Sequence, residues 1–139
     1  MLVWARERVG LFLITKHMKE TLITFETAKL AKEKKFDVPV KKAYHQYKGY
    51  SDMKVNSFKI GKSNHNALNG NCYNTSAPTQ SLLQKWLREL HHINIQNHFL
   101  NKKYAVKIKY GNNISKNIYN KDTYEEALEE ALQEALKLI

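Results

Sequence analysis

The chain has 139 residues, of which 42% are hydrophobic and 26% are charged. This is the composition of an ordinary globular protein, and it excludes collagen-like and strongly disordered classes. The length suits one domain better than two independent ones. Cys72 is the only cysteine, which excludes an intramolecular disulfide and a cysteine-rich zinc site and favours a reducing compartment, so we expect the cytoplasm.

The first 17 residues contain two arginines and a short apolar run, residues 9–14, which Gly10 interrupts. The run is too short for a membrane span, which needs about 20 apolar residues. No small-x-small cleavage motif of a secretory signal follows it. We therefore expect no membrane partner, a non-core extension over 1–17 and a single α+β domain over 18–139. The alternative is an extra strand made from residues 11–14.

A helix is predicted to follow Thr24, whose hydroxyl suits an N-cap, with a modest apolar face of Phe25, Ala28 and Ala31. It should end by Phe36 or Asp37, because a proline at position 39 disfavours helical backbone in the residue before it.

Residues 41–60 mix tyrosines with lysines and alternate only partly between polar and apolar, which predicts a weak hairpin turning near residues 49–52. Residues 61–76 then contain five asparagines and two glycines, residue types that favour turns. We expect a long flexible loop there, serving either as a binding loop or as a variable insertion.

The next segment, APTQSLLQKWLREL, predicts the central helix of the fold. Ser76 or Thr75 is placed to cap it, and Pro78 suits its first turn. One face is apolar at 3.6 residues per turn and should be buried; it consists of Leu82, Leu83, Trp86, Leu87 and Leu90.

The period then changes to two, which predicts antiparallel strands over 93–99 and 104–110, joined by a short connection, and a third strand over 114–119 after a turn at Gly111. A last helix begins at Thr123, which stands in capping-box spacing with Glu126. Its expected core stripe consists of Tyr124, Leu128, Ala131, Leu132, Ala135 and Leu136. The predicted fold class is α+β: an antiparallel three-stranded sheet with helices packed on one face, an α-β-β-β-α core over 77–138, preceded by an N-terminal helix and a weak hairpin.

Two resemblances follow from these segments. TFETAKLAKEK, SAPTQSLLQKWLRE and TYEEALEEALQEALKLI, in this order, resemble a family of short uncharacterised proteins of bacteriophages and mobile elements of Bacteroides-type bacteria. That resemblance implies a bacterial host cell and no particular activity. The order of elements over 79–138 is also similar in topology to double-stranded RNA-binding domains. Those domains place lysines at the start of the last helix, whereas this chain has acids there, which argues against that function.

Charge is the strongest functional clue, because the chain has a formal net charge of +10 and residues 1–121 alone carry +15. This is the pattern of a polyanion-binding protein. The candidate nucleic-acid-binding residues lie on the central helix and the hairpin: Lys85, Arg88, Lys102, Lys103, Lys107 and Lys109. Tyr44, Tyr47 and Tyr50 are candidates for stacking on bases. The alternative is that the lysines are merely solvated. AT-rich coding favours lysine codons, so it would give the same composition without any binding function.

Enzymatic motifs are weak in this sequence. The acids outside the last helix show no paired metal-nuclease spacing, and no phosphate-cradling glycine motif is present. His92 and His98 would lie about 20 Å apart on an extended strand, too far to share a metal ion, and Cys72 beside His65 is a poor nucleophile candidate. We therefore expect no catalysis, metal or cofactor. The leading hypothesis is a nucleic-acid-binding accessory protein; the alternative is a protein-binding module that modulates a host or phage machine.

Overall fold

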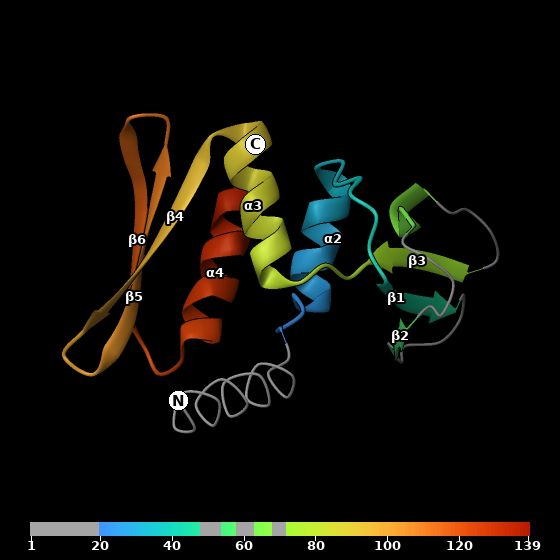
Figure 1. Ribbon diagram of the computed structural model, residues 1–139, viewed down its shortest axis with the longest axis horizontal. Helices are drawn as coiled ribbons and strands as arrows, with labels where there is room; N and C mark the ends of the chain where they lie inside the picture. The colour runs from blue at the N-terminus through green and yellow to red at the C-terminus, as the bar shows by residue number, and fades with distance from the viewer. Residues whose placement is uncertain (1–19, 48–53, 58–62, 68–71) are drawn as a thin grey trace, which may run out of the picture.

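The computed structural model describes residues 20–47, 54–57, 63–67 and 72–139, and these form an α+β fold. Helices lie between two antiparallel three-stranded sheets at opposite ends of the molecule (Figure 1). The elements in chain order are α2 (Phe25–Glu33), β1 (Lys42–Tyr47), β2 (Lys54–Ser57), the short 3₁₀ helix η1 (His65–Ala67), β3 (Cys72–Ser76), α3 (Gln80–His91), β4 (Ile93–Leu100), β5 (Lys103–Tyr110), β6 (Asn113–Lys121) and α4 (Tyr124–Leu136).

The sheet of β4, β5 and β6 is the three-stranded antiparallel sheet that the sequence predicts. β4 and β5 pair along their full lengths, from Ile93 opposite Tyr110 to Leu100 opposite Lys103. The two residues between them, Asn101 and Lys102, both have positive φ, 51° and 62°. Two left-handed residues in a two-residue turn match the natural twist of a hairpin, so this turn fixes the register of the sheet.

Helices α3 and α4 both cover one face of this sheet, as predicted (Figure 1). The strands contribute alternate residues to the shared core, and Ile93, Val106 and Ile108 are each at most 1% exposed. They pack with buried leucines from the two helices, Leu83, Leu87, Leu128, Leu132 and Leu136. Fully burying such a side chain contributes about 1.5–3 kcal/mol, so this layer is the main source of stability.

The start and the end of α3 differ from the prediction. Its N-cap is Thr79, whose hydroxyl accepts from Leu82 N, rather than Ser76 or Thr75. Those two residues belong to β3, and Pro78 lies before the helix, where its carbonyl accepts from Ile23 N. Leu90 is 62% exposed and lies in the last turn of the helix, which ends at His91. The prediction that Leu90 is buried was therefore wrong.

The second sheet has the strand order β2-β1-β3. Pairing of β1 with β2 confirms the strands of the weak hairpin, whereas its turn at 49–52 lies outside the described residues. β3 was not predicted, since residues 61–76 were expected to be a flexible loop. The amide side chain of Asn66 orders part of this segment: it accepts from Ser76 N at 2.8 Å and donates to Phe36 O at 2.8 Å. Residues 1–17, with the expected extension or extra strand, also lie outside the described residues.

The helices α2 and α4 begin where the sequence predicts. Thr24 caps α2 and accepts from Thr27 N, and Thr123 caps α4 and accepts from Glu126 N. Tyr124 is 40% exposed, however, and so does not belong to the core stripe. It is the first residue of α4, where its ring lies 6.3 Å from that of Tyr104 at the margin of the sheet.

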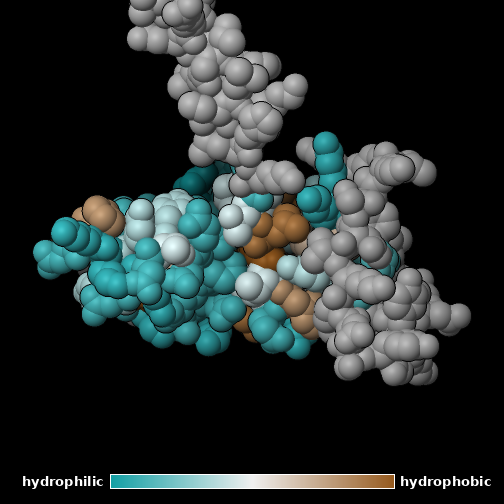
Figure 2. Space-filling model, turned by 90° about the horizontal axis from the view of Figure 1, so that it is seen from below, coloured by the Kyte–Doolittle hydropathy of each residue, from teal (hydrophilic) through white to brown (hydrophobic). Residues whose placement is uncertain are grey.

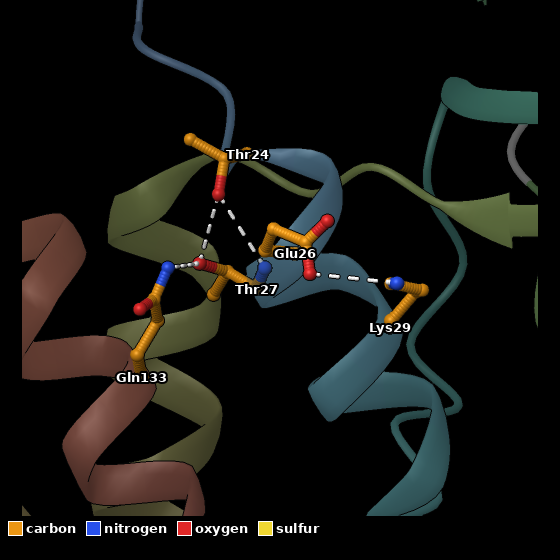
Figure 3. Close-up of polar contacts among 5 residues, drawn as sticks. All are labelled: Thr24, Glu26, Thr27, Lys29 and Gln133. Atoms are coloured by element: carbon orange, nitrogen blue, oxygen red, sulfur yellow. Dashed lines mark hydrogen bonds and ion pairs between the residues drawn. The ribbon is translucent and has the colours of Figure 1, made fainter. Parts of the chain in front are cut away.

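A polar junction joins the beginning of α2 to the two other helices. The hydroxyl of Thr27 lies within hydrogen-bond distance of that of Thr24 and accepts from the side-chain amide of Gln133 on α4 (Figure 3). The Glu129 carboxylate, also on α4, accepts from Thr24 N at 2.7 Å, from the Thr27 hydroxyl, and from Gln80 Nε2 on α3 at 2.8 Å. This carboxylate therefore sets the position of α2 relative to α3 and α4.

Candidate nucleic-acid interface

The face of the β4-β5-β6 sheet that points away from α3 and α4 is covered by no described element (Figure 1). Successive side chains of a strand point to opposite faces. Because Val106 and Ile108 on β5 are buried in the helix-covered core, Lys107 and Lys109 belong to the outer face. The same alternation applies to β4. Ile93 and Ile95 are buried there, so Asn94, which lies between them, and Gln96, which follows Ile95, face outward.

The strand register brings these residues together. Lys107 stands opposite Gln96 on one side and Asn117 on the other, and Lys109 stands opposite Asn94. Directly opposite side chains have Cβ atoms about 4.5–5.5 Å apart. We call Asn94, Gln96, Lys107, Lys109 and Asn117 the outer-face patch. It is a contiguous polar and basic surface on three strands.

The acids of α4 lie on the other side of the sheet, where lysines of β6 pair with them. Lys116 Nζ lies 2.8 Å from a Glu134 carboxylate oxygen, and Lys121 pairs with Glu130. A hydrogen bond from Lys116, with a second from Lys137, lowers the pKa of Glu134. The hydrogen bond to Glu130 likewise raises the pKa of Lys121. Much of the acidic charge at the end of the chain is thus balanced locally.

No carboxylate of the described residues lies within ion-pair distance of Lys107 or Lys109. Both are partly exposed rather than buried. Their charge on the outer face is therefore not cancelled by the described part of the chain.

The six predicted cations do not form a single surface. Lys107 and Lys109 belong to the outer-face patch, and Lys102 lies in the β4–β5 turn. Lys103 is close to that turn, but it forms an ion pair with Asp122, and its hydrogen bond lowers the pKa of that carboxyl. Lys85 and Arg88 are exposed on α3, in the helical layer behind the sheet, and Lys85 lies 3.9 Å from Glu89.

Tyr44, one of the three tyrosines predicted to stack on bases, makes its contacts within the protein. Its hydroxyl donates to Ile23 O at 2.6 Å, and its ring packs edge-on against Phe25 with 5.5 Å between ring centroids. Burial raises the pKa of Tyr44, and the charge of Glu129 adds to the effect. The side chain of Tyr47 and all of Tyr50 lie outside the described residues.

The sequence reasoning missed the amide residues of the outer-face patch. The signal was present, since Asn94 and Gln96 are the polar positions of the alternating strand INIQNHF. Asn117 had no such signal, because β6 is irregular: its pairing with β5 shifts register near Lys109 and again near Tyr104. Tyr119, 60% exposed on the same strand, was missed for the same reason.

The histidines are dispersed over different parts of the fold. His92 ends α3 with a left-handed φ of 56°, His91 packs edge-on against Trp86, and His98 is exposed on β4. His65 is buried and its Nε2 lies 2.9 Å from Val40 O, while the Cys72 side chain is outside the described part. Across the residues that the structure describes, no three histidine, cysteine or acidic side chains are grouped as metal ligands.

A second surface feature is an apolar groove of about 750 Å³ beside the first turn of α3. Its lining includes the apolar Leu22, Val40, Pro78 and Leu82, three lysines and one acid, namely Lys41, Lys42, Lys85 and Glu20. Figure 2 shows apolar surface exposed in this middle part of the molecule, beside a hydrophilic region. The groove shares Lys85 with the predicted cation set but lies away from the outer-face patch.

The fold and this surface define a small α+β protein with an uncovered basic sheet face. Comparisons of the chain with protein-family models, with curated proteins and with solved structures give no match. Among the described residues, no helix has the length and apolar character needed to cross a membrane.

Proposed function

We propose that this chain is a non-enzymatic nucleic-acid-binding protein that uses the outer face of the β4-β5-β6 sheet. One observation carries the proposal: Lys107 and Lys109 are side by side on a face that no described element covers, and no described acid pairs with them. Lysines that neutralise phosphates release counterions, which makes binding favourable and dependent on salt. The formal net charge of +10 supports a polyanionic partner.

The surrounding side chains support the same function. Asn94, Gln96 and Asn117 can both donate and accept hydrogen bonds, as bases and sugars require. The acids of α4 are on the opposite side of the sheet, where they do not face a ligand on the patch. The resemblance to phage and mobile-element proteins adds a setting, which is an accessory role in the cytoplasm of a bacterial host cell.

The experiment compares two double charge reversals by fluorescence anisotropy with labelled nucleic acids across a salt series. Lys107→Glu/Lys109→Glu changes the patch, and Lys29→Glu/Lys35→Glu makes the same change of net charge on exposed residues at α2. We expect the patch variant to bind at least about tenfold more weakly and to reduce the slope of log K against log salt by about 1.8, two contacts at about 0.9 each. Thermal unfolding checks that both variants fold.

Two results would overturn the proposal. Equal losses in the two variants would mean that net charge attracts nucleic acid without a defined surface. Binding by the unchanged protein that disappears near physiological salt would reduce the basic charge to a property of composition.

A second candidate function is binding of a protein segment in the apolar groove, which the apolar side chains and the three lysines of its lining favour. Its partner would combine apolar side chains with acids. Leu82→Asp should abolish such an interaction in nuclease-treated lysate and leave nucleic-acid binding unchanged. Leu90→Asp, the same substitution at an exposed position of α3 outside the groove lining, should leave the interaction intact.

A further inference from the structure

We infer that the nucleic acid recognised by the outer-face patch is B-form duplex DNA, which the sheet enters through the major groove. This inference rests on the proposed function and specifies its ligand. It follows from the size of the uncovered face, from the chemistry of its side chains, and from the positions of the charges around it.

The dimensions of the sheet suit one groove. Three strands spaced about 4.8 Å apart place the axes of β4 and β6 roughly 10 Å apart. The major groove of B-form DNA is about 12 Å wide and admits a two-stranded ribbon, so two neighbouring strands of this sheet fit it, whereas the minor groove is about 6 Å wide. The major groove of duplex RNA is deep and narrow, and side chains cannot read it. Of these three grooves, the major groove of B-form DNA is the one that admits strands of the sheet.

The side chains of the patch have the chemistry that reads base edges. Lysine donates to the O6 and N7 acceptors of guanine, and asparagine or glutamine pairs with the N6 and N7 atoms of adenine. In the register, Lys109 is next to Asn94, and Lys107 stands between Gln96 and Asn117. Each lysine therefore has an amide side chain on a neighbouring strand, so that adjacent base pairs can be read by adjacent strands.

The same face has little to offer an unpaired strand. Binding of single-stranded nucleic acid without sequence preference relies on aromatic side chains on which successive bases stack. Among the described outer-face residues, Tyr119 and the imidazole of His98, which follows Gln96 by two positions on β4, are the aromatic rings near the patch. The other exposed aromatic rings of this sheet, Phe99 and Tyr110, alternate with the patch residues and so belong to the helix-covered face near its ends. The patch is a hydrogen-bonding surface and not a stacking platform.

The charges around the patch suit phosphates beside the groove. Lys102 lies in the β4–β5 turn at one end of the sheet, with no described carboxylate at ion-pair distance. The acids of α4 lie behind the sheet, and two of them are paired with Lys116 and Lys121. A duplex against the outer face therefore meets the unpaired lysines first.

The test measures affinity of the full chain for one mixed sequence prepared as duplex DNA, single-stranded DNA and duplex RNA, at equal salt. We expect duplex DNA to bind at least about tenfold more tightly than the other two forms. Methyl green, which occupies the major groove, should compete with the protein, and netropsin, which occupies the minor groove, should not.

A selection from a randomised duplex pool then tests reading of the bases. The unchanged protein should enrich a short sequence, and Asn94→Ala/Gln96→Ala should lose that enrichment while retaining the charge-dependent part of binding. Asn112→Ala/Asn113→Ala is the matched control, because these exposed residues lie in and after the β5–β6 turn, outside the patch. It should enrich the same sequence as the unchanged protein.

The outcomes separate this inference from the proposed function. Tighter binding of single-stranded DNA or duplex RNA, weakened by Lys107→Glu/Lys109→Glu, would overturn the duplex-DNA inference and leave the proposed function standing. Competition by netropsin, or a duplex pool that gains no enriched sequence, would also overturn reading through the major groove. If no form binds near physiological salt, both the inference and the proposed function are wrong.

Discussion

Replacing Glu129 by alanine should loosen the attachment of α2 to the rest of the molecule. The carboxylate accepts hydrogen bonds from Thr24 N, the Thr27 hydroxyl and Gln80 Nε2. These donors come from the segment at the start of α2 and from α3, while Glu129 itself is on α4. One side chain therefore joins three parts of the chain that are 49 or more residues apart in sequence.

The magnitude follows from what each donor does after the substitution. Thr24 N is exposed and can bond to water, so its loss costs little. Gln80 keeps its bond to Glu125 O at 3.0 Å, so it loses one of two partners. Thr27 is fully buried and loses a charged acceptor, but the Thr24 hydroxyl at 3.1 Å remains within its reach as a neutral one. A hydrogen bond to a charged group contributes about 1.5–3 kcal/mol, and a neutral one about 0.5–1.5 kcal/mol. We expect a total loss of about 2 kcal/mol.

Urea denaturation followed by circular dichroism measures this free energy of unfolding. Glu130→Ala is the control, because it makes the same change of residue type one position along α4. Its ion pair with Lys121 is partly exposed, and such pairs contribute about 0–1 kcal/mol. A loss below about 1 kcal/mol for Glu129→Ala, or equal losses in both variants, would refute the reasoning that Glu129 holds the helices together.

Three further predictions concern stability. Leu87→Ala should lower the free energy of unfolding by about 2–5 kcal/mol, because Leu87 is fully buried. Leu90→Ala should lower it by less than about 1 kcal/mol, because Leu90 is 62% exposed. Urea denaturation of the two variants measures the difference. His92→Gly should raise the melting temperature, since His92 ends α3 at a φ of 56° and left-handed backbone costs a non-glycine residue about 1 kcal/mol. Lys116 lowers the pKa of Glu134. The ionised Glu134 therefore stabilises the folded state above its ordinary pKa of about 4.3, and this stabilisation is lost as pH falls. In acid denaturation, the difference in free energy of unfolding between the unchanged protein and Glu134→Gln should shrink toward zero.

The local pattern of the sequence was sufficient for the elements whose partners are close in the chain. Thr24 and Thr123 cap their helices through bonds to the third residue after them. The alternation over INIQNHF and YAVKIKY, with a two-residue turn between them, produced the long β4–β5 hairpin. In each case the residues that form the contact lie within about one hairpin of one another, so the sequence alone determined the result.

Only the tertiary structure decided the features that depend on distant residues. Strand β3 forms because β1, about 30 residues earlier, offers its free edge to an asparagine-rich segment that has no strand pattern of its own. Thr79, rather than Ser76, caps α3 because residues before it are held in that strand and by the Leu22–Thr79 bridge.

The candidate site divides in the same way. Alternation in β4 and β5 determined that Lys107 and Lys109 would share a face, but not which face the helices would leave uncovered. The choice depends on α3 and α4, whose leucines bury Val106 and Ile108 and turn the intervening lysines outward. The sequence determined a basic, alternating strand, and the packing of two helices made it a surface that can meet a ligand.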